Sequence, residues 1–156
     1  MSLPDKLNNF IEDHPDGWCA LDFDDTVWDI NYKVSENAKE LVRQCQPNIA
    51  VVTFNSYMTP DKCCSDKSLR ELGLCQRGKC IVSDKRWAHR NEDGGHAMVL
   101  NGENVGDSRS RGIKTEIMGK MKLKPKNTIF IDDRKSNIDP AADAGYHVHW
   151  VKNTPL

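Results

Sequence analysis

The sequence predicts an α/β fold in three layers, with a central parallel sheet of about five strands and helices on both faces. Two observations support this prediction. Five short apolar runs recur along the chain, and segments with helical periodicity separate most of them, as in folds that alternate strands with helices. The predicted strands occupy residues 18–23, 49–54, 80–83, 128–132 and 147–151.

The predicted helices have recognisable start or stop signals. Ser35 is a favourable N-cap, and Pro47 ends the helix that follows it. Gly73 and Gly145 each stand just after a periodic segment, where glycine commonly terminates a helix. The predicted helices occupy residues 35–45, 60–72, 114–121 and 140–144.

The length of 156 residues suits a single domain with its own core, and we expect one domain over residues 1–156. Residues 87–111 interrupt the alternation of strands and helices, because they are rich in Gly, Asn, Asp and Arg. We therefore expect a loop-rich insertion around 84–112, within which Asn101-Gly102 is a hairpin signal.

Composition excludes several function classes. The chain has 22 Lys plus Arg against 23 Asp plus Glu, which excludes a globally basic nucleic-acid binder. The lysine-rich run at 120–126 leaves nucleic acid possible as a partner but not favoured, because such runs near helix ends are usually solvated faces. No apolar run approaches the ~20 residues of a membrane helix, and the first residues do not resemble a signal peptide. We therefore expect a soluble, cytoplasmic protein without a membrane partner.

Six cysteines are many for a chain of this length. Without an export signal we expect reduced thiols rather than a disulfide framework. Four of them could serve as zinc ligands, although no Cys-x-x-Cys pair is present. Small buried residues with a few exposed thiols are the favoured interpretation. The four alternative zinc ligands are Cys63, Cys64, Cys75 and Cys80.

Two carboxylates stand at the end of the first predicted strand. Asp22 and Asp24 are two residues apart, so their side chains share one face for as long as the strand continues. The carboxyl edge of a parallel sheet is where ligands bind in open α/β folds. Taken alone, the segment also suits an acidic surface turn, which Thr26 can stabilise by local hydrogen bonds.

Other predicted strands deliver complementary chemistry to the same edge. Thr53 and Asn55 follow the second strand, Lys114 starts the helix before the fourth, and Asp132 and Asp133 end the fourth. Carboxylates gathered in one cleft repel each other, so the cluster is stable only if a cation or shared protons neutralise it, and oxygen ligands in this number suit Mg²⁺. A lysine and a hydroxyl beside Mg²⁺ are groups that can bind a phosphoryl group.

In order and context, these residues are similar to the four sequence motifs of the haloacid dehalogenase (HAD) superfamily. The resemblance spans roughly residues 17–151 and implies a Rossmann-like fold. Ser56 is an alternative to Thr53, and Lys120 is an alternative to Lys114. The motif residues in chain order are Asp22, Asp24, Thr26, Thr53, Lys114, Asp132 and Asp133.

The resemblance implies a role for each residue. Asp22 would be the nucleophile that forms an aspartyl-phosphate, and Asp24 would be the acid and base that moves the proton. Thr53, with Asn55 beside it, and Lys114 would bind the oxygens of the phosphoryl group. Mg²⁺ would be the cofactor. Its implied ligands are Asp22, Asp24 through its backbone carbonyl, Asp132 and Asp133.

The resemblance is to HAD members with a small or absent cap, because the segment between Thr26 and Thr53 is too short for a large cap domain. Asp24 favours a phosphatase, since dehalogenases of this superfamily lack this acid. The implied function is Mg²⁺-dependent hydrolysis of a phosphomonoester, on a phosphorylated small molecule, a phosphoprotein or a nucleic-acid end. The alternatives are a phosphoacceptor signalling domain, against which the position of Lys114 before the acidic pair argues, and an inactive HAD-fold binding protein.

Overall fold

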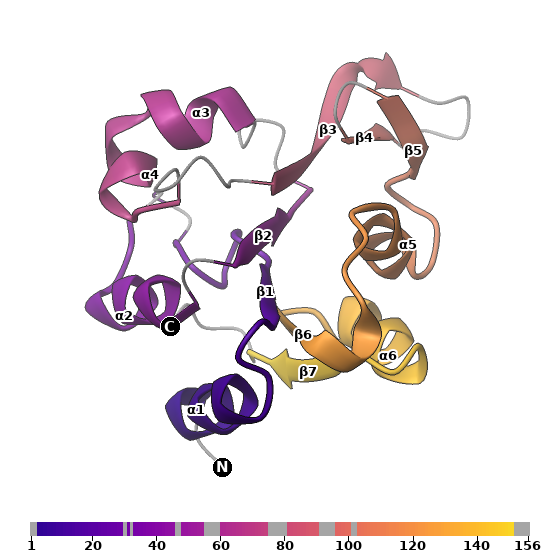
Figure 1. Cartoon of the computed structure of the whole chain (residues 1–156). Coiled ribbons are helices and arrows are strands. Elements are labelled where there is room, and N and C mark those ends of the chain that lie inside the picture. Colours follow the sequence, from indigo (N-terminus) through magenta and orange to yellow (C-terminus); the bar gives the residue numbers. More distant parts are fainter. Residues whose placement is uncertain are drawn as a thin grey trace.

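The computed structural model describes residues 3–29, 31, 33–45, 48–54, 60–74, 81–90, 96–100 and 103–151. A seven-stranded sheet with the order β5-β4-β3-β2-β1-β6-β7 forms the centre of this part of the chain (Figure 1). The strands are β1 (Trp18–Leu21), β2 (Ile49–Val52), β3 (Ile81–Arg90), β4 (His96–Leu100), β5 (Glu103–Asp107), β6 (Thr128–Asp132) and β7 (His147–Trp150). The helices are α1 (Leu3–Asp13), α2 (Glu36–Cys45), α3 (Pro60–Ser65), α4 (Lys67–Glu71), α5 (Ile113–Lys120) and α6 (Lys135–Asp143), with a 3-10 turn η2 (Pro125–Asn127).

The five strands β3, β2, β1, β6 and β7 run parallel to one another. In the middle of the sheet, Leu21 of β1 pairs with Val51 of β2 on one side and with Ile131 of β6 on the other. The carboxyl ends of these three strands therefore lie at one edge. This arrangement confirms the predicted parallel sheet of about five strands.

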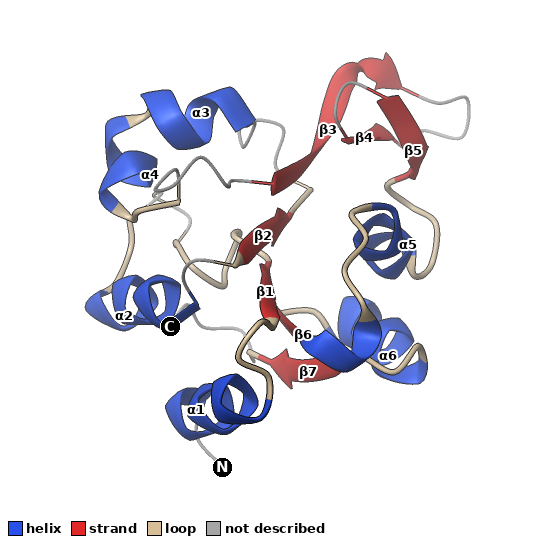
Figure 2. Ribbon diagram, viewed as in Figure 1, coloured by secondary structure: helices blue, strands red, loops and turns tan. Residues whose placement is uncertain are grey.

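Helices cover both faces of the sheet, which confirms the predicted three-layer architecture (Figure 2). Alternate residues of a strand point to opposite faces. Leu21 and Ile131 therefore pack with apolar side chains of α1, α2 and α4 in one core cluster. Ala20 and Phe130 pack with α5 and α6 in the other cluster. The strands that carry the site are thus buried on both faces, as is usual for parallel sheets.

Much of segment 84–112, for which the sequence predicts loops, is β-structure. The strand β3 continues to Arg90 and pairs antiparallel with β4, which in turn pairs antiparallel with β5. Leu100 lies opposite Glu103 in the β4–β5 pair, as expected for a hairpin at the Asn101-Gly102 signal, although residues 101 and 102 themselves are outside the described part of the chain. Pairing between neighbouring backbones tolerates polar residues at a sheet edge, so the polar composition suggested loops where strands exist.

Two predicted helices have different bounds in the structure. The helix predicted at 60–72 is divided into α3 and α4, because the side chain of Asp66 accepts hydrogen bonds from the Ser68 and Leu69 N–H groups and caps a new helix. The helix predicted to begin at Pro140 begins at Lys135, so this proline lies inside α6. Elsewhere Ser35 caps α2 as predicted, accepting a hydrogen bond from the Ala38 N–H at 3.1 Å.

Two further expectations concern the state of the cysteines and the absence of a membrane-spanning helix. Cys19 and Cys45 are buried free thiols, in line with the expected small buried residues. Within the described residues, no helix is both long enough and apolar enough to cross a bilayer. The side chains of the alternative zinc ligands lie outside what the structure describes; these are Cys63, Cys64, Cys75 and Cys80.

Candidate active site

Three carboxylates gather at the carboxyl edge of the central strands. Asp22 follows β1, Asp132 ends β6, and Asp133 comes next. Oxygen atoms of these three side chains all lie within 4.8 Å of one another. The Asp22 N–H donates a hydrogen bond to the Ile131 carbonyl at 3.0 Å, so the pairing of β1 with β6 sets the position of the first carboxylate relative to the other two.

The ammonium group of Lys114 joins two of these carboxylates. Its Nζ lies 2.8 Å from Asp22 Oδ1 and 2.7 Å from Asp132 Oδ2, and only 2% of the Lys114 surface is exposed. Gly112, just before α5, has a φ of +74°, a left-handed conformation that glycine adopts without strain. The structure therefore places Lys114 in the cluster, whereas the alternative Lys120 is exposed at the other end of α5.

Burial controls the electrostatics of this cluster. Burial raises the pKa of the Asp22 carboxyl well above its usual range; Lys114 opposes this shift and Asp132 adds to it. Burial alone would lower the pKa of the Lys114 ammonium, but the two carboxylates raise it overall. Burial also raises the pKa of Asp133, and Asp132 contributes to that rise. The site therefore holds a stable cation among carboxylates that resist being ionised together.

Hydrogen bonds fix the orientation of two carboxylates. Thr26 Oγ1 donates to Asp22 Oδ2 at 3.1 Å, in the turn that follows β1. The Arg134 N–H donates to Asp132 Oδ1 at 2.8 Å, and Asn137 Nδ2, on α6, lies 3.3 Å from Asp132 Oδ2. Both oxygens of Asp22 and both oxygens of Asp132 thus accept hydrogen bonds from defined donors. Such support limits the freedom of the side chains before any ligand binds.

Two residues of the site were not predicted from the sequence. Phe54 follows Thr53, and its ring centroid lies 4.7 Å from Lys114 Nζ, within the range of a cation–π contact. Asn137 stands five residues after Asp132 and supports it. The available signal was the position of each residue: Phe54 extends the end of an apolar strand, and Asn137 lies in the first turns of a helix that starts beside the acidic pair.

Asp24 lies outside this group of carboxylates. Its side chain is exposed, and Asp24 Oδ1 accepts a hydrogen bond from Trp28 Nε1 at 3.0 Å. Asp25 has a φ of +58°, and three successive N–H groups after it, beginning with that of Thr26, donate to the Phe23 carbonyl. The chain therefore turns sharply after β1, and this turn presents Asp24 to solvent beside the buried Asp22.

Thr53 lies at the same edge of the sheet, one strand away from Asp22. It is fully buried, and the register of Leu21 with Val51 brings it level with Phe23. Asn55 and the alternative hydroxyl of Ser56 fall outside the described residues. The described part of the predicted phosphate-binding segment thus ends at Phe54.

The residues present fit a divalent metal ion. Three ionised carboxylates and one ammonium group leave a formal charge of −2, which a divalent cation would neutralise. All three donors offer hard oxygen atoms, the ligand type that Mg²⁺ prefers. The chemistry of the donor set therefore agrees with the cofactor expected from the sequence.

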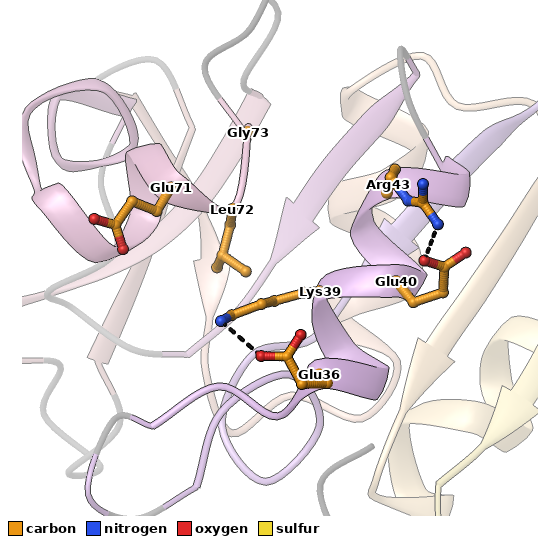
Figure 3. A pocket seen from close by; sticks show the side chains of 7 residues that line it. All are labelled: Glu36, Lys39, Glu40, Arg43, Glu71, Leu72 and Gly73. Atoms are coloured by element: carbon orange, nitrogen blue, oxygen red, sulfur yellow. Dashed lines mark hydrogen bonds and ion pairs between the residues drawn. The ribbon is translucent and has the colours of Figure 1, made fainter.

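A cavity of about 450 Å³ lies elsewhere, between α2 and the end of α4. Its charged walls are largely neutralised, because Glu36 pairs with Lys39 and Glu40 pairs with Arg43 along α2 (Figure 3). These pairs are exposed, and exposed ion pairs form readily without a ligand. None of the site residues predicted from the sequence lines this cavity.

Comparisons with known proteins give limited information. No protein-family model matches the sequence, and no curated protein is significantly similar to it. Among the solved structures that the chain resembles is a predicted HAD-like family hydrolase from Porphyromonas gingivalis, with 18% sequence identity and a TM-score of 0.43. The match covers 78% of this chain and 52% of that one, so this chain spans about half the length of that protein.

Proposed function

We propose that this chain is a HAD-type phosphatase, a Mg²⁺-dependent hydrolase of phosphomonoesters that acts through an aspartyl-phosphate. One observation carries the proposal: the buried contact of Lys114 Nζ with both Asp22 and Asp132, at 2.8 and 2.7 Å, beside Asp133. The burial of an ion network of this kind is costly unless every charge is paired. This network lies at the carboxyl edge of the sheet, where ligands bind in open α/β folds.

In the first proposed step, one carboxylate oxygen of Asp22 attacks phosphorus. The bond between phosphorus and the ester oxygen breaks, and the leaving oxygen takes a proton from Asp24 to give the alcohol. In the second step, water attacks the phosphorus of the aspartyl-phosphate and gives a proton to Asp24, which releases phosphate and restores both side chains. Covalent catalysis of this type divides one difficult displacement into two easier ones.

The remaining residues orient and stabilise the reacting groups. Lys114 opposes the effect of burial on the pKa of Asp22, which favours the ionised form of this carboxyl, and it adds positive charge where the phosphoryl oxygens would lie. Thr26 fixes the second oxygen of Asp22. Asp22, Asp132 and Asp133 would hold Mg²⁺, which supplies charge stabilisation to the phosphoryl oxygens when it is bound.

The exposed position of Asp24 suits the proton transfer assigned to it. The turn after β1 presents this carboxylate to solvent, and the indole N–H of Trp28 holds one of its oxygens at 3.0 Å. A proton donor to the leaving group has to meet the substrate on its outer side, away from the buried nucleophile. We therefore assign the proton transfer to Asp24 and the attack on phosphorus to Asp22.

The test is hydrolysis of 4-nitrophenyl phosphate by the purified protein. We expect turnover that requires Mg²⁺, stops in EDTA, and is lost in Asp22→Asn; Asp24→Asn should slow it by about 10²–10⁴-fold, the usual contribution of a general acid–base group. Asp143→Asn is the matched control, because Asp143 is an exposed carboxylate at the end of α6. Full turnover in Asp22→Asn would refute the nucleophile assignment.

Mass spectrometry after an acid quench distinguishes the proposal from its main alternative. A hydrolase should contain the phosphorylated protein only during turnover, and Asp22→Asn should not become phosphorylated. A phosphorylated protein that persists without release of phosphate would instead indicate a phosphoacceptor domain. Metal binding without turnover or phosphorylation on a broad panel of phosphates would indicate a binding protein.

A further inference from the structure

Trp150 is an exposed aromatic residue beside the acidic cluster. It is the last residue of β7, and it lies in register with Asp132 on the neighbouring strand β6. Its relative exposure is 39%, and among the described residues it is the one large apolar residue that is exposed. An isolated exposed apolar residue needs no explanation on its own, but the contacts of Trp150 set it apart.

The orientation of the indole ring is tied to the site. Trp150 Nε1 donates a hydrogen bond of 2.8 Å to the carbonyl oxygen of Asp133, whose carboxylate belongs to the acidic cluster. Lys135 Nζ, in the first turn of α6, lies 5.8 Å from the centroid of the same ring. A ring held by its N–H at one edge cannot turn freely, so its exposed surface has a defined direction next to the cluster.

A ring in this position can bind the part of a substrate that projects from the acidic cluster. If the phosphoryl group reaches Asp22 and Lys114, which are almost fully buried, the leaving group has to extend outward from the carboxyl edge toward solvent. The exposed indole then offers a surface for a planar group, and the nearby ammonium of Lys135 adds a cation at the same place. Stacking on an aromatic side chain does not depend on the identity of the ring.

We propose that Trp150 is a specificity-determining residue that stacks on an aromatic ring in the leaving group of the substrate. This inference rests on the proposed phosphatase function and narrows its substrate to phosphomonoesters that carry a planar ring. Two sources share this chemistry: a nucleoside monophosphate, with a base, and phosphotyrosine, with a phenyl ring. The experiment has one arm for each source.

Each arm compares two substrates that differ in the ring. The first arm measures kcat/KM for adenosine 5′-monophosphate and for ribose 5-phosphate; the second measures it for phosphotyrosine and for phosphoserine. Trp150→Ala should lower kcat/KM for the aromatic substrate about tenfold relative to kcat/KM for the non-aromatic substrate, mainly by raising KM. A change of this size is within the range for loss of one stacked base. The arm in which the ratio falls identifies the source of the ring.

Two variants separate stacking from support of the strand. Trp150→Phe keeps an aromatic surface but loses the hydrogen bond to the Asp133 carbonyl, so it should retain most of the ratio. His147→Ala changes the opposite end of the same strand and should leave the ratio at the wild-type value. The inference would be overturned if Trp150→Ala left the ratio of the two kcat/KM values unchanged, whether kcat/KM fell equally for both substrates of a pair or for neither.

Equilibrium binding keeps the inference testable without turnover. In the Asp22→Asn background, calorimetric titration with adenosine 5′-monophosphate or phosphotyrosine should show about tenfold weaker binding when Trp150→Ala is added, with no such change for ribose 5-phosphate or phosphoserine. If the wild type hydrolysed no phosphate but binding still depended on Trp150, the proposed hydrolase function would be refuted and the stacking role would stand. Hydrolysis without any dependence on Trp150 would count against the stacking role alone.

Discussion

Replacement of Lys114 by methionine tests the electrostatic account of the site most directly. Methionine preserves much of the apolar stem but removes the ammonium that contacts Asp22 and Asp132 at 2.8 and 2.7 Å. Both carboxylates are buried, so their charges would lose their cation while remaining out of water. Removal of one partner from a buried ion pair typically destabilises a protein by about 3–5 kcal/mol.

The size of this loss should depend on pH. Burial already raises the pKa of Asp22 above its ordinary value of 3.8, and Lys114 is the group that opposes the rise. Without Lys114 the folded-state pKa should rise further, so that the folded protein binds a proton more readily than the unfolded chain. For a carboxyl with a raised pKa, stability is present below the unfolded value and is lost as pH rises through the folded value. The penalty in Lys114→Met should therefore be near the upper end of the range at pH 8 and smaller at pH 5.

The assay is urea unfolding followed by tryptophan fluorescence, in EDTA, at both pH values. Lys120→Met is the matched control, because Lys120 is exposed at the end of the same helix and its replacement should change the free energy of unfolding by no more than about 0.5 kcal/mol. A Lys114→Met variant as stable as this control at pH 8 would refute the reasoning. An equally large penalty at pH 5 would show that lost packing, rather than unpaired charge, causes the destabilisation.

Two further predictions concern the metal and an unsatisfied hydroxyl. Saturating Mg²⁺ should raise the melting temperature of the wild type by roughly 5 °C or more, since a ligand at 100 times its Kd stabilises the folded state by about 2.7 kcal/mol. Scanning fluorimetry with and without EDTA measures this rise, and an equal rise in Asp133→Asn would argue against the carboxylate cluster as the binding site. Thr128→Val should stabilise the protein by about 1 kcal/mol, because Thr128 Oγ1 is buried and has no hydrogen-bond partner among the described residues. Urea unfolding checks this prediction, and a loss of stability would show that the hydroxyl has a partner after all.

The parallel sheet could be predicted because its signals are local. Each run such as Ile129-Phe130-Ile131 is apolar over its whole length, as expected for a strand buried on both faces, and the chain order of strands and helices then limits the possible topologies. The closeness of Asp22 to Asp132 follows from the same logic, since the sheet brings strand ends together. Only the structure could distinguish Lys114 from Lys120, because burial of a side chain depends on how α5 packs.

Other features depend on pairing between distant parts of the chain or on single side chains. The polar composition of residues 84–112 does not show that β3 pairs with β4, because strand propensity depends strongly on the neighbouring strands. The helix α1 was missed although its signal is present, with Leu3, Leu7 and Phe10 at helical spacing and buried against the sheet. Asp66 lies inside the helix predicted at 60–72, and only its capping hydrogen bonds show that a new helix begins there.

The contact between Lys114 and Asp22 joins residues 92 positions apart, from a helix on one face of the sheet and from a strand inside it. The ion network therefore depends on the packing of α5 against the sheet and joins parts of the chain that are far apart in sequence. Burial of the charged forms of Asp22 and Asp132, with Asp133 half-buried beside them, opposes folding unless they are neutralised, and Lys114 supplies one positive charge for the three carboxylates. A chain under selection for stability alone would be more stable with apolar residues in these positions. A divalent cation bound among the three carboxylates would supply the charge that Lys114 alone does not.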